Sequence, residues 1–95
     1  MAENIILFFS NDACGVCEPL FDKLEILVME DFPRLDFKKI SILENPEYRA
    51  KYNVYSSPLI ILILEGKEFL RFGGNTSLYE LKQKIGRLYT LKFEE

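Results

Sequence analysis

The sequence has no histidine and no tryptophan, and only two of its 95 residues are cysteines. Without histidine the chain cannot carry a Ser-His or Cys-His catalytic pair, and it lacks the commonest protein ligand of transition metals. Two cysteines are also too few for a small secreted domain that is stabilised by several disulfide bonds. These absences exclude histidine-dependent hydrolases and disulfide-built domains.

Long apolar runs and strong positive charge are missing as well. The longest aliphatic run, Leu59–Leu64, has six residues, whereas a membrane-spanning helix needs about 20. The apolar run near the N-terminus, Ile5–Phe9, has five residues against about 7–15 in a signal peptide. A net charge of −3 and a pI near 5.0 give no basic surface for nucleic acid. We therefore expect a cytoplasmic protein with no membrane or nucleic-acid partner.

The composition is that of an ordinary globular domain. The chain is 48% hydrophobic and 28% charged, which argues against disorder. A chain of this length can bury one modest core. We expect residues 1–95 to form a single domain.

The first half of the chain alternates strand and helix signals. Residues Asn4–Ser10 form a β-branched and aromatic run typical of a strand buried on both faces. Apolar residues then recur at helical spacing from Val16 to Val28, and Pro33 ends that segment. A second strand is expected from Leu35 to Ile42.

The second half predicts a short helix, a hairpin and a last helix. Asn45 is the expected cap of the short helix, with Pro46 at its first position and its end near Asn53. Residues 59–64 and 68–72 are the expected strands of a hairpin, joined by Glu65-Gly66-Lys67. The last helix begins at a capping box, residues 77–80, and its buried stripe is Leu78, Leu81, Ile85 and Leu88. The order β-α-β-α-β-β-α predicts an α/β fold with a four-stranded mixed sheet and helices on both faces.

The two cysteines stand between the first strand and the first helix. Unpaired N–H groups and the helix dipole favour an anion at that place, and thiols there or in a C-x-x-C pair have a pKa lowered to about 3.5–7.5. Cys14 is the expected nucleophile, and Cys17, one helical turn inward, is the expected resolving thiol. The pair predicts thiol–disulfide exchange.

Two other interpretations of the pair remain open. A zinc site uses the same spacing but needs four ligands, so a second chain, Asp12 or Glu18 would have to complete it. Two inert cysteines could instead serve as small hydrophobes, although a pair at a strand-to-helix turn fits that role poorly. We expect no metal.

Five segments together resemble the thioredoxin family, in the family's order and spacing over nearly the whole chain. They are Cys14-Gly15-Val16-Cys17, the run from Asn45-Pro46-Glu47 to Tyr52-Asn53-Val54, Ser57-Pro58, Glu65-Gly66-Lys67 and Gly73-Gly74. The resemblance implies a minimal thioredoxin-like core, without the strand and helix with which the family usually begins. It also implies protein disulfides as substrates, reduction by an external flavin-dependent reductase, no bound cofactor and a monomer.

The resemblance further implies a substrate groove beside the cysteines. Ser57-Pro58 would be a cis peptide facing the disulfide, and Val16, Ser56, Ser57 and Gly74 would line the groove with Pro58. Their backbone groups would pair with an extended substrate segment. The plainer alternative is that Pro58 is only the first residue of a strand.

The chain departs from the family's pattern at the cysteines. Phe8 stands where thioredoxins typically carry a buried aspartate that moves the proton of the resolving cysteine, and phenylalanine cannot do so. Lys39, which corresponds to the usual partner of that aspartate, is expected to be a surface lysine. Asp12 and Glu18 flank the pair with negative charge, which opposes thiolate formation.

Two other functions therefore stay open beside a thioredoxin-type oxidoreductase. Gly73-Gly74 before a capped helix resembles the turn with which glutaredoxins hold glutathione, although no basic residue directly precedes Cys14. A binding module that keeps the fold with little redox turnover is favoured by Phe8 and the flanking acids.

Overall fold

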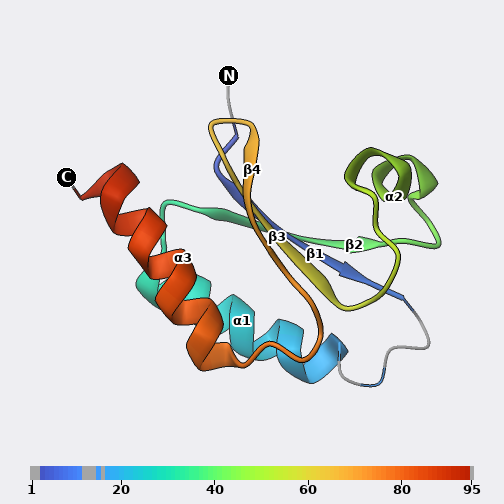
Figure 1. The fold of residues 1–95 in the computed structure, drawn as a ribbon. Coiled ribbons are helices and arrows are strands. Elements are labelled where there is room, and N and C mark those ends of the chain that lie inside the picture. Colours follow the sequence, from blue (N-terminus) through green and yellow to red (C-terminus); the bar gives the residue numbers. More distant parts are fainter. Residues whose placement is uncertain (1–2, 12–14, 16, 95) are drawn as a thin grey trace.

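Seven elements follow one another in the order that the sequence predicts (Figure 1). The computed structural model describes residues 3–11, 15 and 17–94. The elements are β1 (Ile5–Ser10), α1 (Cys17–Asp31), β2 (Asp36–Ser41), α2 (Pro46–Tyr52), β3 (Leu59–Leu64), β4 (Lys67–Phe72) and α3 (Leu78–Phe93).

The four strands form one mixed sheet in the order β2-β1-β3-β4. Strand β1 pairs with β2 in parallel and with β3 antiparallel, and β3 pairs with β4 antiparallel. All six residues of β1 and all six of β3 are buried, because these two strands are central and the sheet is covered on both faces. The α/β class and the four-stranded mixed sheet are thus confirmed.

Alternation along the central strands divides the core into two layers. Ile6 and Phe8 face α1 and α3, whereas Leu7 and Phe9 face the side covered by α2. Figure 1 shows α1 and α3 together on one face of the sheet and α2 on the other. The layer beneath α1 and α3 is the larger one, and it contains Cys17.

The β3–β4 hairpin follows from its turn residues. Glu65 and Gly66 have φ values of 52° and 77°, the left-handed pair that a two-residue hairpin turn requires. Strand β4 consequently begins at Lys67, one residue earlier than expected. The register between the two strands shifts between Leu62 and Ile63.

The two predicted helix caps have different outcomes. Ser77 Oγ accepts a hydrogen bond from the backbone N–H of Glu80 at 3.1 Å, so Ser77 caps α3 as expected. Asn45 occupies the cap position of α2, but its side chain makes no capping hydrogen bond. Its Nδ2 instead donates to the carbonyl oxygen of Ser41 at 2.9 Å. Asn45 therefore holds the expected cap position, and its backbone carbonyl accepts from the N–H groups of Tyr48 and Arg49, but its side chain does not cap the helix.

Helices α1 and α3 bury the expected stripes with small changes. Leu81 and Ile85 of α3 are buried, while Leu78 and Leu88 are partly buried against the same layer. The sequence analysis missed Tyr89, which is buried and accepts a hydrogen bond at its hydroxyl from the backbone N–H of Arg34. Within the described residues no helix has both the length and the apolar character to cross a membrane.

Candidate functional site

Cys17 is the first residue of α1, and its side chain is only 3% exposed. It is disulfide-bonded, and it belongs to the buried cluster that also contains Phe8 and Leu24. Three other predicted site residues, Asp12, Cys14 and Val16, lie outside the described residues. Cys17 therefore has the inward position, at a helix N-terminus, that the sequence analysis expected for the resolving thiol.

The segment before β3 forms the neighbouring part of the site. The peptide bond between Ser57 and Pro58 is cis, as the resemblance implies. Pro58 is buried, Ser57 is half-buried and Ser56 is exposed. The Asn11 Nδ2 donates a hydrogen bond to Ser57 Oγ at 2.8 Å, across 46 residues of sequence.

Strand register explains why Asn11 reaches Ser57. Phe9 pairs with Leu59 in the antiparallel β1–β3 ladder, so the chain leaving β1 runs alongside the chain entering β3. The link from β1 to α1 starts at Asn11, and this hydrogen bond holds the start of the link against Ser57, the residue before the cis proline. Sequence analysis did not single out Asn11, because nothing in a local pattern indicates a partner so far along the chain.

Gly74 lies directly against the proline ring. A Cβ placed on Gly74 would be 2.8 Å from Pro58 Cδ and 3.2 Å from Pro58 Cγ, closer than side chains approach in folded proteins. Gly73 has no such neighbour, since its Cβ would meet only Asn75 Oδ1, at 3.8 Å. Packing against Pro58 gives a reason for glycine at position 74 that does not involve glutathione.

These groups gather at one end of the sheet. Three of the predicted groove residues, Ser57, Pro58 and Gly74, come together where β3 begins and β4 ends. Figure 1 shows the start of α1 at the same end. Among the described residues, no three cysteine or acidic side chains gather where they could hold a metal ion.

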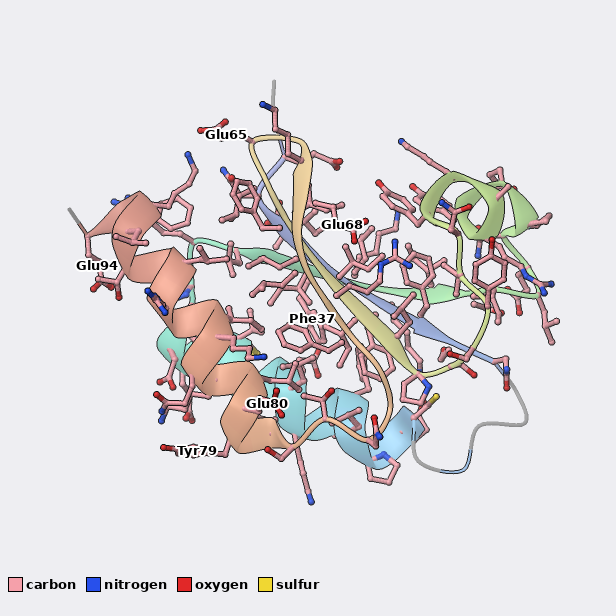
Figure 2. All side chains as sticks on the ribbon, viewed as in Figure 1. Phe37, Glu65, Glu68, Tyr79, Glu80 and Glu94 are labelled. Atoms are coloured by element: carbon pink, nitrogen blue, oxygen red, sulfur yellow. The ribbon has the colours of Figure 1, made fainter. Side chains whose placement is uncertain are left out.

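Beneath α1, the place of the family's buried acid is filled by aromatic rings. Phe8 is fully buried, and its ring meets Phe21 and Phe37 edge-on, at centroid distances of 5.4 and 6.5 Å. Phe21 and Phe37 stack on each other at 5.1 Å. Figure 2 shows Phe37 among the side chains that fill the space between the sheet and the helices. This part of the layer is apolar and offers no proton acceptor from these three side chains.

Lys39 is exposed, as expected of a surface lysine, and it has a defined partner. It lies beside Phe8 in the parallel ladder of β1 and β2. Its Nζ pairs with Glu18 Oε1 and stands 4.8 Å from the centroid of the Phe21 ring. The negative charge that we expected at Glu18 is thus compensated by a cation.

The comparisons with known proteins agree with this geometry. The sequence pattern of the family described as Thioredoxin matches residues 1–87. The thioredoxin-like protein YdfQ of Bacillus subtilis is 29% identical over 85 residues, which cover 90% of this chain and 75% of YdfQ.

Two solved structures are similar over nearly the whole chain. Thioredoxin 1 of Thermosipho africanus superposes with a TM-score of 0.83 at 30% identity, covering 93% of this chain and 97% of the other. Fasciola hepatica thioredoxin gives a TM-score of 0.80 at 34% identity, over 90% of this chain and 81% of the other. With the fold, the cis proline and the family match in agreement, the chain belongs to the thioredoxin family of thiol–disulfide redox proteins.

Proposed function

We propose that the protein is a protein-disulfide reductase of the thioredoxin type. The Cys14 thiolate attacks one sulfur of a substrate disulfide, forms a mixed disulfide and releases the other substrate sulfur as a thiolate. Cys17 then attacks Cys14 Sγ and releases the second substrate thiolate. The substrate disulfide gains two electrons and two protons, and the Cys14–Cys17 pair is oxidised to a disulfide.

The observation that carries this proposal is the disulfide-bonded Cys17 at the N-terminus of α1, at the end of the sheet where Pro58 is held. Gly74 and the Asn11–Ser57 hydrogen bond fix the segment before β3 from two sides. A rigid edge of this kind suits an extended substrate, which would pair with the backbone at Val16, Ser56, Ser57 and Gly74.

The remaining parts of the proposal follow from the family. The domain binds no cofactor, because the cysteine pair itself carries the two electrons. A flavin-dependent reductase restores the dithiol. We propose a monomer that works in the cytoplasm, where the reducing pool keeps such a pair available for turnover.

One observation favours a second function, a binding module with little redox turnover. Phe8 is fully buried among rings, so a group that accepts the Cys17 proton is missing at the family's usual place. Such a module would dock its partner without using Cys14.

Reduction of a protein disulfide distinguishes the two functions. The reduced protein should reduce insulin, followed by precipitation of the separated chains. The Cys14→Ser variant should lose all detectable rate, whereas Gly73→Ala, a control near the groove with an open Cβ position, should keep it. If the wild type shows no reduction, the oxidoreductase proposal is wrong and the binding module is favoured. If Cys14→Ser retains most of the rate, the assignment of Cys14 as the nucleophile is wrong.

A further inference from the structure

The ion pair between Lys39 and Glu18 lies beside the reactive end of the fold. Glu18 directly follows Cys17 in the first turn of α1, and Lys39 reaches it from β2. The two residues are 21 positions apart, so the pair joins the helix that begins at the cysteines to the neighbouring edge strand.

The rings of Phe8, Phe21 and Phe37 leave the Lys39 side chain at the surface of the protein. Lys39 stands next to Phe8 in the sheet, on the face covered by α1. The rings of Phe8, Phe21 and Phe37 fill the space beneath the helix, so no carboxylate can meet the lysine there. Its Nζ rests over Phe21, a favourable place for a cation, and pairs with Glu18 at the surface.

This end of the sheet carries little other charge. The segments 5–11, 53–64 and 72–79, which run to and from the site, contain no charged residue. In the described first two turns of α1, the charged residues are Glu18, which pairs with Lys39, and Asp22 and Lys23. An uncompensated carboxylate next to Cys17 would oppose a thiolate and offset the helix N-terminus.

We propose that Lys39 is a positioning residue for disulfide exchange, which acts by holding and neutralising Glu18 beside the cysteine pair. This inference rests on the proposed function. The lysine touches neither substrate nor sulfur in this role. By compensating the charge of Glu18, Lys39 removes a repulsion that would otherwise disfavour the Cys14 thiolate, the species that starts the exchange.

Alkylation of the reduced protein by iodoacetamide, measured from pH 5 to 10, tests this role directly. Lys39→Met should move the pH midpoint of Cys14 alkylation upward by about half a pH unit, because the negative charge of Glu18 is then no longer compensated. Lys39→Arg should restore the wild-type midpoint. Glu18→Gln should move it downward, and the double variant should return close to the wild type.

Lys92→Met is the matched control. Lys92 also forms an exposed ion pair, with Glu65 at the β3–β4 turn (Figure 2), far along the sheet from α1's first turn. Loss of the Lys92–Glu65 pair should leave the alkylation midpoint unchanged. The variant therefore shows whether removing any surface ion pair affects the midpoint.

The outcomes separate this inference from the proposed function. Equal midpoints for Lys39→Met and Lys92→Met would overturn the role of Lys39, even where the wild type reduces insulin. A shift at Lys39 in a protein that does not reduce insulin would support the electrostatic role and overturn the function. If Lys39→Met does not fold, Glu18→Gln decides, because Glu18 is 69% exposed and an unchanged midpoint in that variant contradicts the inference.

Discussion

Because Gly74 has only a hydrogen atom for a side chain, the ring of Pro58 can pack directly against it. The Cα of Gly74 lies so close to the Pro58 ring that any side chain there must displace it. The ring in turn is buried at the start of β3, whose residues are all buried. A side chain added at Gly74 should therefore disturb the proposed groove, because the Pro58 ring that it would meet is buried.

Gly74→Ala should lower both stability and activity. The overlap at 2.8 Å forces the Pro58 ring or the β4–α3 loop to move, at a cost of about 1–3 kcal/mol in the free energy of unfolding. A displaced groove should reduce the insulin reduction rate about tenfold or more. Urea unfolding and the insulin assay measure the two effects.

Gly73→Ala is the control for this prediction, because its Cβ would meet one atom at 3.8 Å. Equal losses in the two variants would show that the contact with Pro58 is not what requires glycine.

Phe8 is the second residue whose replacement is informative. Phe8→Asp places a carboxylate in a fully buried ring cluster, which should cost at least about 3 kcal/mol of unfolding free energy. Where the variant folds, the carboxylate is a base beneath the disulfide, so resolution of a mixed disulfide at pH 7 should be faster than in the wild type. Stopped-flow measurement of product release follows this step.

The wild type should instead resolve mixed disulfides slowly near pH 7 and faster as the pH rises, since the Phe8 ring offers no base to the Cys17 thiol. Phe8→Leu keeps the position apolar and should keep this pH dependence. A wild-type rate that is flat from about pH 6 to 9 would show that another group accepts the proton.

At the scale of elements, Arg71 joins the edge strand β4 to the end of α2. Its guanidinium donates to both carboxylate oxygens of Glu68, at 2.8 and 2.9 Å. It also donates to the carbonyl oxygens of Tyr52 and Asn53, at 2.6 and 3.3 Å. Those carbonyls end a helix that turns through a left-handed Asn53, so one side chain satisfies groups that the helix leaves unpaired. Figure 2 shows Glu68 on the side of β4 that faces α2.

Arg71→Gln should therefore destabilise the protein more than Glu68→Gln. The first change removes the donor to two carbonyls and to a carboxylate, at about 1–2 kcal/mol. The second removes a half-exposed ion pair, at less than about 1 kcal/mol. Urea unfolding at pH 7 compares the two variants, and equal losses would show that the contacts with α2 contribute nothing.

The hydrogen bond from Arg71 also gives this pair a pH dependence. It lowers the pKa of the Glu68 carboxyl below its ordinary value of 4.5. A lowered pKa stabilises the fold above the unfolded-state value, and that contribution is lost as the pH falls through the folded-state value. The difference in unfolding free energy between wild type and Glu68→Gln should thus be present at pH 6 and vanish near pH 3. A difference that persists at pH 3 would contradict the ionic origin.

At the scale of the whole molecule, the sequence predicts the architecture well because the local signals agree with one another. The buried run 59–64, the positive-φ turn at Glu65-Gly66 and the capping serine at position 77 each specify one local structure. The cis proline followed from the family resemblance. Asn45 shows the limit: it holds the expected cap position, but its side chain bonds elsewhere, because a short polar side chain has several possible partners and the chain's path decides among them.

The parts of the site that the sequence did not predict are all contacts between distant segments. Asn11 with Ser57 and Gly74 with Pro58 depend on strand register, and Lys39 with Glu18 depends on how α1 packs on the sheet; no local sequence pattern connects these residues. The loss of the family's acid was visible in the sequence, because Phe8 stands at its usual place before Cys14. The redirection of Lys39 toward Glu18 needed the positions of three rings.

Capture of the mixed disulfide tests disulfide exchange through Cys14 most directly. Reduced Cys17→Ser is incubated with insulin, and covalent complexes are resolved by mass spectrometry without reductant. Because the second thiol is absent, the complex on Cys14 should accumulate and should disappear on addition of dithiothreitol, while Cys14→Ser should give almost none. Absence of the complex from Cys17→Ser, or equal amounts from both variants, would contradict exchange through Cys14.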